Sequence, residues 1–226
     1  YMKDIEGEKL LVHAGRQVGV VSHAKRVPET AFNVTARRDE RIRGRIVVTA
    51  HVDTKIGTPG AIDNATGVAA VLALAELLKD DPGRRPVELV VFNGEDYYGA
   101  PGQVRYVERN AGRFGDIALN INIDGAGYKE GLSCFSPFAL PENIQGVFNT
   151  LLRETPEITG GLPWYQGDHS LFLQNGCPAI AVSSQWFIEN MECQQITHTP
   201  ADNPGVVDCR RVAQCAAAIA ELIRKI

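Results

Sequence analysis

The chain has 226 residues, of which 44% are hydrophobic and 22% are charged, and its formal net charge is -4. This balance is typical of a globular domain, and it excludes an intrinsically disordered chain, a collagen-like fibre and a disulfide-stapled mini-protein. The mild acidity argues against nucleic acid as a partner, because phosphate binding needs a clustered basic surface.

No segment of the sequence is long and apolar enough to suggest a membrane partner. The longest apolar stretch, residues 67–78, contains Glu76 and falls short of the ~20 residues that a spanning helix needs. No signal peptide is visible, but Tyr1 stands where an initiator methionine is expected, so we interpret the chain as trimmed. The five cysteines form no CxxC pair, which favours reduced thiols and a cytoplasmic over a secreted protein; one disulfide in a secreted protein is the alternative.

The first half of the chain predicts strands that lead into a helix. Two β-rich runs, residues 17–22 and 32–36, indicate a strand meander, and residues 45–50 are typical of a buried strand. Residues 63–79 then follow the helical period. The apolar stripe expected to face the sheet consists of Val68, Val71, Leu72, Ala75 and Leu78.

The second half continues the alternation of strands and helices. Buried strands are predicted at residues 87–92, 117–123 and 179–183, with a helical stretch at 104–109 between the first two. One face of a final helix carries Val212, Cys215, Ala216, Ile219 and Ile223. The pattern predicts an α/β fold, with a mixed, largely parallel central sheet and helices on both faces.

The domain organisation follows from the absence of repeats and linkers. No internal repeat or low-complexity segment interrupts the sequence, so we expect residues 1–226 to form a single catalytic domain. Residues 1–31 fit this pattern least well, and we interpret them as the remnant of a trimmed N-terminal or inserted region.

Chemistry-bearing residues stand at the carboxyl ends of the predicted strands, where α/β sheets gather their binding sites. These positions and the start of the first helix hold His51, Asp53, Glu95, Asp96, Asp124 and Asp63. Several ionised carboxylates in one crevice repel one another unless a positive charge holds them together. Lys55 is the one lysine or arginine in these motifs, so a divalent metal is the better counter-charge; histidine with carboxylates suits zinc, with manganese or cobalt as substitutes.

Asp63 and a further histidine, His198, have simpler interpretations when each is taken alone. Asp63 at the start of a helix is a good N-cap residue. The His198-Thr-Pro200 segment fits an ordinary turn, because proline interrupts regular structure. The metal interpretation depends on the ordered set of motifs rather than on any one of them.

Six short motifs follow one another along the chain: Ala50-His-Val-Asp53, Gly60-Ala-Ile-Asp-Asn-Ala-Thr-Gly67, Phe92-Asn-Gly-Glu-Asp96, Asn122-Ile-Asp-Gly125, Gly167-Asp-His169 and Thr197-His-Thr-Pro-Ala-Asp202. In this order they resemble the two-zinc aminopeptidases of the M28 family. The resemblance covers roughly Phe32 to the C-terminus. It implies a phosphorylase/hydrolase-like, zinc-exopeptidase fold.

The resemblance also implies two zinc ions and their ligands. Asp63 would bridge the two ions. His51 and Asp124 would complete one site, and Asp96 and His198 the other. The peptide bond that follows Asp63 would be cis. The family usually has a second glutamate where this chain has Asp96, and the shorter side chain is expected to weaken that site or to favour another metal.

Glu95 would be the general base of a hydrolytic reaction. It would take the proton of a metal-bridged water and pass it to the leaving amine. Asp53, also assigned to the catalytic machinery, would orient the ring of His51, and Asp202 would do the same for His198. The resemblance therefore implies an aminopeptidase acting on peptides with a free N-terminus, whose ammonium group would lie among the carboxylates.

Other functions remain open at this point. A carboxypeptidase or an N-acyl or dipeptide amidohydrolase would use the same two metals, whereas an inactive binding module would have lost ligands or the base. Asp168 and His169 would either line the substrate pocket or, for Asp168, cap a short helix. Aromatic residues that would wall a pocket or simply pack the core are Phe135, Phe138, Trp164, Trp186 and Phe187.

Overall fold

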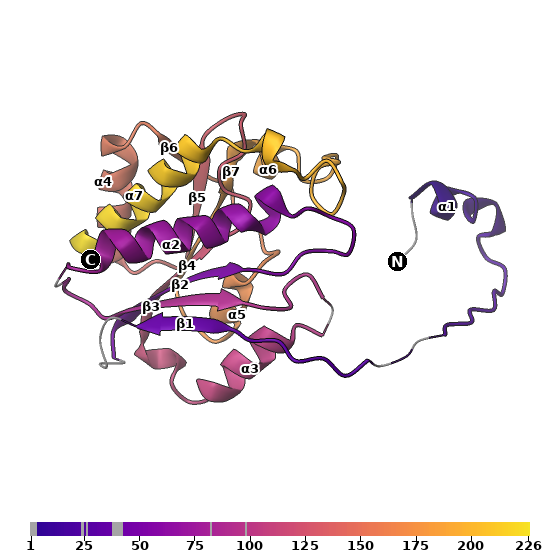
Figure 1. Ribbon diagram of the computed structural model, residues 1–226, viewed down its shortest axis with the longest axis horizontal. Helices are drawn as coiled ribbons and strands as arrows, with labels where there is room; N and C mark the ends of the chain where they lie inside the picture. The colour runs from indigo at the N-terminus through magenta and orange to yellow at the C-terminus, as the bar shows by residue number, and fades with distance from the viewer. Residues whose placement is uncertain (1–3, 24, 26, 38–42, 82, 98) are drawn as a thin grey trace. The chain divides into compact units, whose positions relative to one another are not determined.

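The computed structural model describes residues 4–23, 25, 27–37, 43–81, 83–97 and 99–226 (Figure 1). The chain divides into two compact units, Tyr1–Thr30 and Ala31–Ile226. The first unit contains the short helix α1 (Asp4–Glu8) and a 3-10 turn (Leu11–His13). The strand predicted at residues 17–22 is wrong, because this exposed segment has no regular secondary structure and no strand to pair with in the described chain.

The second unit is built on a seven-stranded mixed sheet, in the order β1-β3-β2-β4-β7-β5-β6. Its strands are β1 (Val34–Arg37), β2 (Arg45–His51), β3 (Val87–Phe92), β4 (Ile117–Ile123), β5 (Ser133–Phe138), β6 (Ile158–Gly160) and β7 (Ala179–Ser184). The four pairings β2–β3, β2–β4, β4–β7 and β5–β6 are parallel, while β1–β3 and β5–β7 are antiparallel. The predicted mixed, largely parallel sheet is confirmed.

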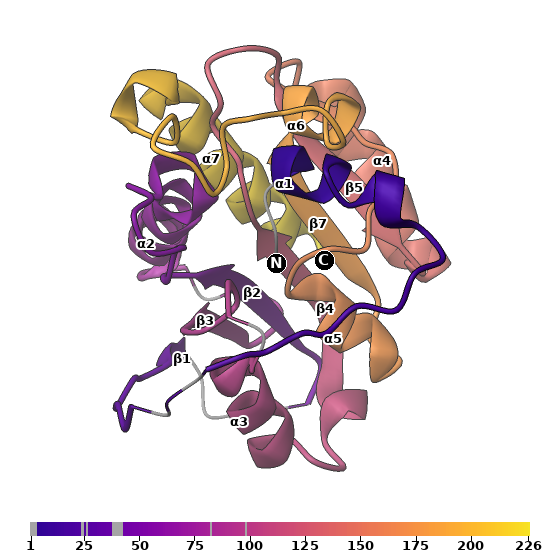
Figure 2. The ribbon, with the colours of Figure 1, turned by 90° about the vertical axis from the view of Figure 1, so that its right-hand side faces the viewer.

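Helices cover both faces of this sheet, as predicted (Figures 1 and 2). The helices of this unit are α2 (Thr66–Leu78), α3 (Pro101–Arg109), α4 (Glu142–Glu154), α5 (His169–Gln174), α6 (Gln185–Glu189) and α7 (Cys209–Lys225). Helices α2, α4 and α7 lie on one face, and α3 and α5 lie on the other. Along the chain, β5, β6 and α4 lie between β4 and β7, and these three elements were not predicted from the sequence.

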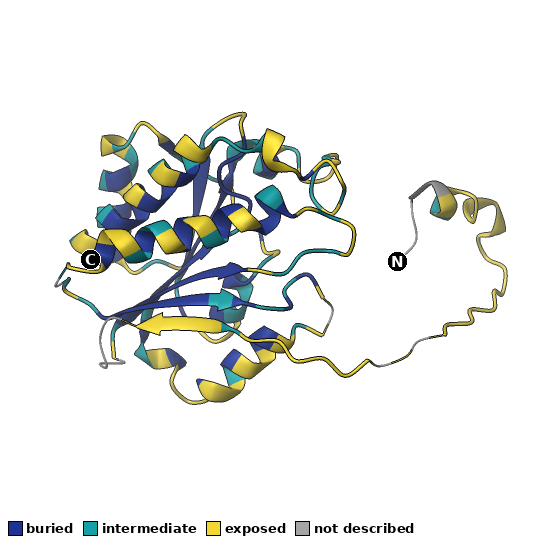
Figure 3. Cartoon of the chain, viewed as in Figure 1, coloured by how far each residue is buried: buried dark blue, intermediate teal, exposed yellow. Residues whose placement is uncertain are grey.

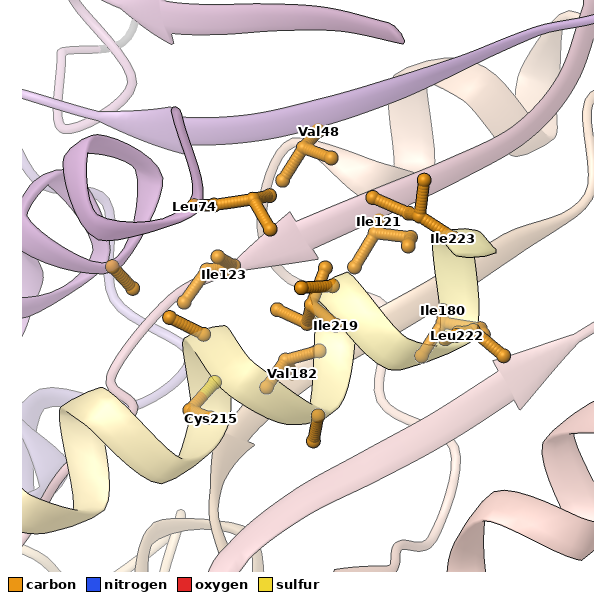
Figure 4. Close-up of a cluster of buried hydrophobic side chains, with 14 of the residues drawn as sticks. Val48, Leu74, Ile121, Ile123, Ile180, Val182, Cys215, Ile219, Leu222 and Ile223 are labelled. Atoms are coloured by element: carbon orange, nitrogen blue, oxygen red, sulfur yellow. The ribbon is translucent and has the colours of Figure 1, made fainter. Parts of the chain in front are cut away.

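The main core lies between the sheet and helices α2, α4 and α7. Leu74 of α2 and Ile219 of α7 meet Val48, Ile121 and Val182 of the central strands (Figure 4). The stripe predicted for the last helix is confirmed, because each of its five residues is buried. Burying a side chain of this size contributes about 1.5–3 kcal/mol, so this layer holds the strands in place.

The stripe predicted for α2 is wrong in part. Leu72 is 66% exposed, whereas Ala70 and Leu74 are fully buried beside Val71 and Leu78. The helix begins at Thr66, and its buried face is rotated away from Leu72 because it packs on α7 as well as on the sheet. In contrast to the expectation from the sequence, residues 61–78 are long and apolar enough by composition to cross a membrane, but half of this stretch is buried inside the domain.

The burial pattern separates the central strands from the sheet edge (Figure 3). Every residue of β2 is buried, whereas every residue of the edge strand β1 is exposed. Because β3, β2 and β4 run parallel, their carboxyl ends lie together along one edge of the sheet, the edge formed by strand ends and not by the outer strand β1. The loops that follow these three strands therefore come together there.

Candidate metal centre

Two groups of ligand atoms converge at this edge. Each group offers three atoms that lie within 4.8 Å of one another. The first group is His51, the last residue of β2, with Asp63 and Asp124. His51 Nε2 lies 3.1 Å from Asp63 Oδ1 and 3.5 Å from Asp124 Oδ1. The strand-end motifs of the sequence predicted this set, and the fold brings it together.

The second group is Asp63, Asp96 and His198. His198 Nε2 lies 3.1 Å from Asp63 Oδ2 and 2.9 Å from Asp96 Oδ1. Asp63 thus turns one carboxylate oxygen toward each histidine, which is the geometry of a bridging ligand. His198 comes from the loop after α6, has a left-handed backbone (φ 61°) and is half-exposed on its side chain.

Asp63 is held by anchors on both sides. The peptide bond between Asp63 and Asn64 is cis, as the family resemblance implied. The Asn64 amide donates to the carbonyl of Ile123 (2.8 Å) and accepts from the amide of Gly67 (3.1 Å). These contacts tie the backbone beside Asp63 to the end of β4 and to the first turn of α2.

Asp202 provides the other anchor, and its partner differs from the predicted one. Its carboxylate accepts from the backbone amides of Ile62 (2.6 Å) and Asp63 (3.2 Å) rather than from the ring of His198. Both donors belong to buried residues, and a buried backbone N–H needs an acceptor more than a half-exposed ring does. Asp202 therefore fixes the backbone of Asp63.

Asp53 also differs from its predicted role. Its backbone carbonyl, and not its carboxylate, lies 3.0 Å from His51 Nδ1. Because a carbonyl only accepts, Nδ1 carries a proton, and Nε2 is the ring nitrogen that faces the ligand cluster. The Asp53 carboxylate accepts from the backbone amides of Gly94 (2.6 Å), Glu95 (3.1 Å) and Asp96 (3.0 Å), so one side chain fixes the loop that follows β3.

The electrostatics of the ligands show a site that demands positive charge. Burial alone would lower the pKa of His51, but the carboxylates of Asp124 and Asp63 raise it well above its usual value. The interactions of His198 with Asp63 and Asp96 raise its pKa to about 10. Burial by itself would raise the pKa of Asp63, but the two histidines lower it. Protons thus supply the positive charge that a dication would otherwise bring.

Glu95 lies beside the first group without belonging to it. Its Oε2 is 3.9 Å from His51 Nε2. Burial and the charge of Asp124 raise the pKa of Glu95 to about 8, and bound cations would oppose this shift. A carboxylate in this position is within one water of the ligand cluster, which suits a proton-transferring group.

The residues present fit a metal ion. Nitrogen and carboxylate oxygen donors are the ligand set of zinc sites. His51 Nε2 and Asp96 Oδ2 are buried and have no hydrogen-bond partner in the described chain, although each belongs to one of the ligand groups. Buried polar atoms without partners are costly, and a metal ion in each ligand group would give each atom a partner.

Asp168 and His169 lie behind the site. Asp168 stands at the N-cap position of α5, yet it makes no capping hydrogen bond in the described chain and accepts instead from the Gln103 amide (2.7 Å). Burial raises its pKa to about 7. His169 Nε2 lies 2.8 Å from the carbonyl of Trp164. Gly167, and neither of these two residues, lines the pocket.

A cavity of about 260 Å³ adjoins both ligand groups. Its apolar wall is formed by Trp164, Phe187, Ile188 and Met191. Of the five aromatic residues considered for a pocket, Trp164 and Phe187 line this cavity. Phe135 and Phe138 belong to the core, and Trp186 packs against Tyr128 instead.

Three residues of the site were not assigned from the sequence. Asn64 sits inside a recognised motif, so its anchoring role was within reach. Gln103 lies on α3, and nothing in its sequence surroundings indicates a contact with Asp168. Lys55 was noted as a cation in the motifs, but its contact with Asp96 (Nζ to Oδ1, 3.4 Å) depends on how two loops meet.

Comparisons of the sequence agree with this geometry. The model of peptidase family M28 matches residues 33–223. Aminopeptidase YwaD of Bacillus subtilis (strain 168) is 23% identical over 243 residues, which cover 99% of this chain and 51% of that protein. The chain spans about half the length of this curated relative.

Comparisons of the structure support the same fold. The crystal structure of BSAP, a zinc aminopeptidase from Bacillus subtilis, superimposes with a TM-score of 0.71 at 20% identity, covering 84% of this chain and 49% of that one. A glutaminyl cyclase from Bacteroides thetaiotaomicron gives 0.69 at 19% identity, covering 85% and 76%. The fold therefore supports more than one reaction, so the reaction has to be inferred from the residues of the site.

Proposed function

The chain belongs to peptidase family M28, and from this premise we propose that it is a zinc-dependent aminopeptidase that removes the N-terminal residue of peptides. The observation that carries the proposal is the pair of ligand groups that share Asp63, with Glu95 3.9 Å from His51 Nε2. An inactive binding module would lack part of this set. Within the described residues, each expected ligand and the base stand together.

The proposed centre holds two zinc ions, with manganese or cobalt as substitutes. His51, Asp63 and Asp124 would hold the first ion, and Asp63, Asp96 and His198 the second. When bound, zinc supplies the Lewis acidity that activates water and polarises the scissile carbonyl.

The side chains of the protein perform the remaining steps. Glu95 accepts the proton of the attacking water and donates it to the leaving amine, which departs neutral. Asp53 holds the backbone of the Glu95 loop through three hydrogen bonds, and Asp202 orients Asp63 through two. Both residues position reacting groups without touching the substrate.

The substrate is recognised by charge and by shape. Asp63, Glu95, Asp96 and Asp124 line the cavity and provide negative charge for a free N-terminal ammonium group. The wall of Trp164 and its apolar neighbours suits an apolar side chain on the N-terminal residue. The free cysteines fit a reducing compartment, so we place the enzyme in the cytoplasm rather than outside the cell.

Turnover of aminoacyl 4-nitroanilides tests the proposal. Leucyl nitroanilide should be hydrolysed, a chelator should abolish the activity and zinc should restore it. N-acetyl-leucyl nitroanilide is the matched control, and it should not be cleaved because it lacks the ammonium group. Hydrolysis that continues without metal contradicts the proposal, and preference for the blocked substrate indicates an amidohydrolase instead.

A further inference from the structure

Lys55 places a positive charge against the second ligand group. It lies four residues beyond the end of β2, and its Nζ is 3.4 Å from Asp96 Oδ1 and 5.8 Å from the centre of the Tyr97 ring. The Asp96 side chain is almost fully buried (3% exposed), whereas that of Lys55 is 34% exposed. A cation that reaches in from solvent therefore meets a buried carboxylate.

The oxygen that Lys55 contacts also faces a histidine of the second ligand group. Asp96 Oδ1 lies 2.9 Å from His198 Nε2, and the two residues belong to the second ligand group. The first ligand group differs, because within the described residues the ion pairs of Asp124 involve a histidine and no lysine or arginine. An ion at the second position thus shares its carboxylate with an ammonium group, and an ion at the first position does not.

Lys55 adds a positive charge that the second metal ion has to oppose. Four carboxylates line the cavity beside the two groups. One dication and the lysine leave them with a net charge of minus one, and a second dication brings the net charge to plus one. Without the lysine, two dications would neutralise the four carboxylates. Like charges held close together in a buried site repel strongly, so the lysine disfavours the second ion.

We propose that Lys55 competes with the second metal ion for Asp96, so that the centre binds one ion tightly and the other weakly. Binding of the second ion moves the ammonium group of Lys55 away from Asp96 and toward solvent, where part of its side chain already lies. The centre then changes from one ion to two according to metal supply. This inference rests on the proposed metal-dependent function and concerns the regulation of that site.

Zinc titration of the metal-free full chain, in competition with a chromophoric chelator, tests this inference. In the unmodified protein the second equivalent should bind at least about tenfold more weakly than the first. Lys55→Met removes the charge but keeps most of the aliphatic stem, and it should tighten the second equivalent at least about tenfold while leaving the first within about twofold. Lys55→Arg keeps the charge and should behave like the unmodified protein.

Two controls make the result decisive. Lys79→Met removes the charge of an exposed lysine at the end of α2 and should change neither affinity. The unchanged first affinity reports that the Lys55 variants are folded. An unchanged second affinity in Lys55→Met, or equal effects of Met and Arg, would overturn the inference. Absence of any zinc binding in the unmodified protein would instead contradict the proposed function.

Discussion

The two halves of the metal centre use similar ligands but rest on very different supports. His51 is the last residue of a buried central strand and is 1% exposed on its side chain, with its ring fixed by the carbonyl of Asp53. His198 stands on a loop, is 50% exposed on its side chain and has a left-handed backbone. One histidine therefore stands on a buried strand and the other on an exposed loop.

This difference suggests an order of events at the site. A preorganised ligand set binds a metal without first ordering its side chains, whereas an exposed loop loses conformational freedom when its histidine binds. Asp63 belongs to both halves, so occupation of the first half also fixes one ligand of the second. The buried half is expected to fill first and to carry the chemistry, because Glu95 lies beside it.

Glu95→Gln gives the largest expected effect and tests whether chemistry belongs to the buried half. Loss of the general base should lower kcat by about 10²–10⁴-fold while both zinc affinities stay the same. Turnover of leucyl nitroanilide and zinc content by mass spectrometry measure the two quantities. Glu142→Gln, on the exposed surface of α4, is the matched control. If zinc is lost from Glu95→Gln, then Glu95 is a ligand and the assignment fails.

His51→Ala and His198→Ala compare the two halves directly. His51→Ala should weaken the first zinc equivalent by more than about 100-fold, since removal of a ligand exceeds the effect of removing its supporting partner. His198→Ala should affect the second equivalent alone. Zinc titration of each variant checks this, and equal losses of the first equivalent in both variants would abolish the distinction between the halves.

Asp53→Asn tests the support that links the halves. An asparagine offers one acceptor oxygen and one NH₂ group to three backbone donors, so the loop carrying Glu95 and Asp96 should shift. We expect a loss of about 10–100-fold in kcat/KM and of about 1–3 kcal/mol in the free energy of unfolding. Asp80→Asn, at the exposed end of α2, should change neither quantity. A stability loss with unchanged kcat/KM would mean that Asp53 does not position the base.

The pH dependence of the metal-free protein gives the smallest effect. The raised pKa values of His198 (about 10) and Glu95 (about 8) mean that both groups hold protons more tightly in the folded state. Their contribution to stability is full below their ordinary pKa values and is lost as the pH rises through the folded ones. Tm of the metal-free protein should fall by about 2–4 °C between about pH 6 and 9. The fall is small because solvent screens the half-exposed His198.

The zinc-loaded protein should lose less Tm over the same range, since the metal replaces these protons. Differential scanning calorimetry with and without zinc measures both curves. His198→Ala should flatten the curve of the metal-free protein. A Tm that rises with pH in the metal-free protein would contradict the sign of this linkage.

The sequence predicted the central part of the fold better than its margins. Strands β3 and β4 match their predicted ranges, because long apolar β-rich runs between polar strand ends admit few other structures. Leu72 was misplaced, since two alternative apolar faces of α2 differ little in composition and packing against α7 chose between them. Residues 17–22 have strand propensity without a partner strand, and propensity alone does not form a sheet.

Sequence by itself determined which residues we propose as ligands and as base, because they stand at strand ends or in motifs that resemble those of the M28 family. The tertiary structure alone decided what the supporting carboxylates hold. Asp53 and Asp202 bind backbone amides rather than the predicted histidine rings, and Lys55 meets Asp96 across two loops. These contacts join segments distant along the chain, so their geometry is set by the register of the parallel strands and the packing of the helices, which no local pattern encodes.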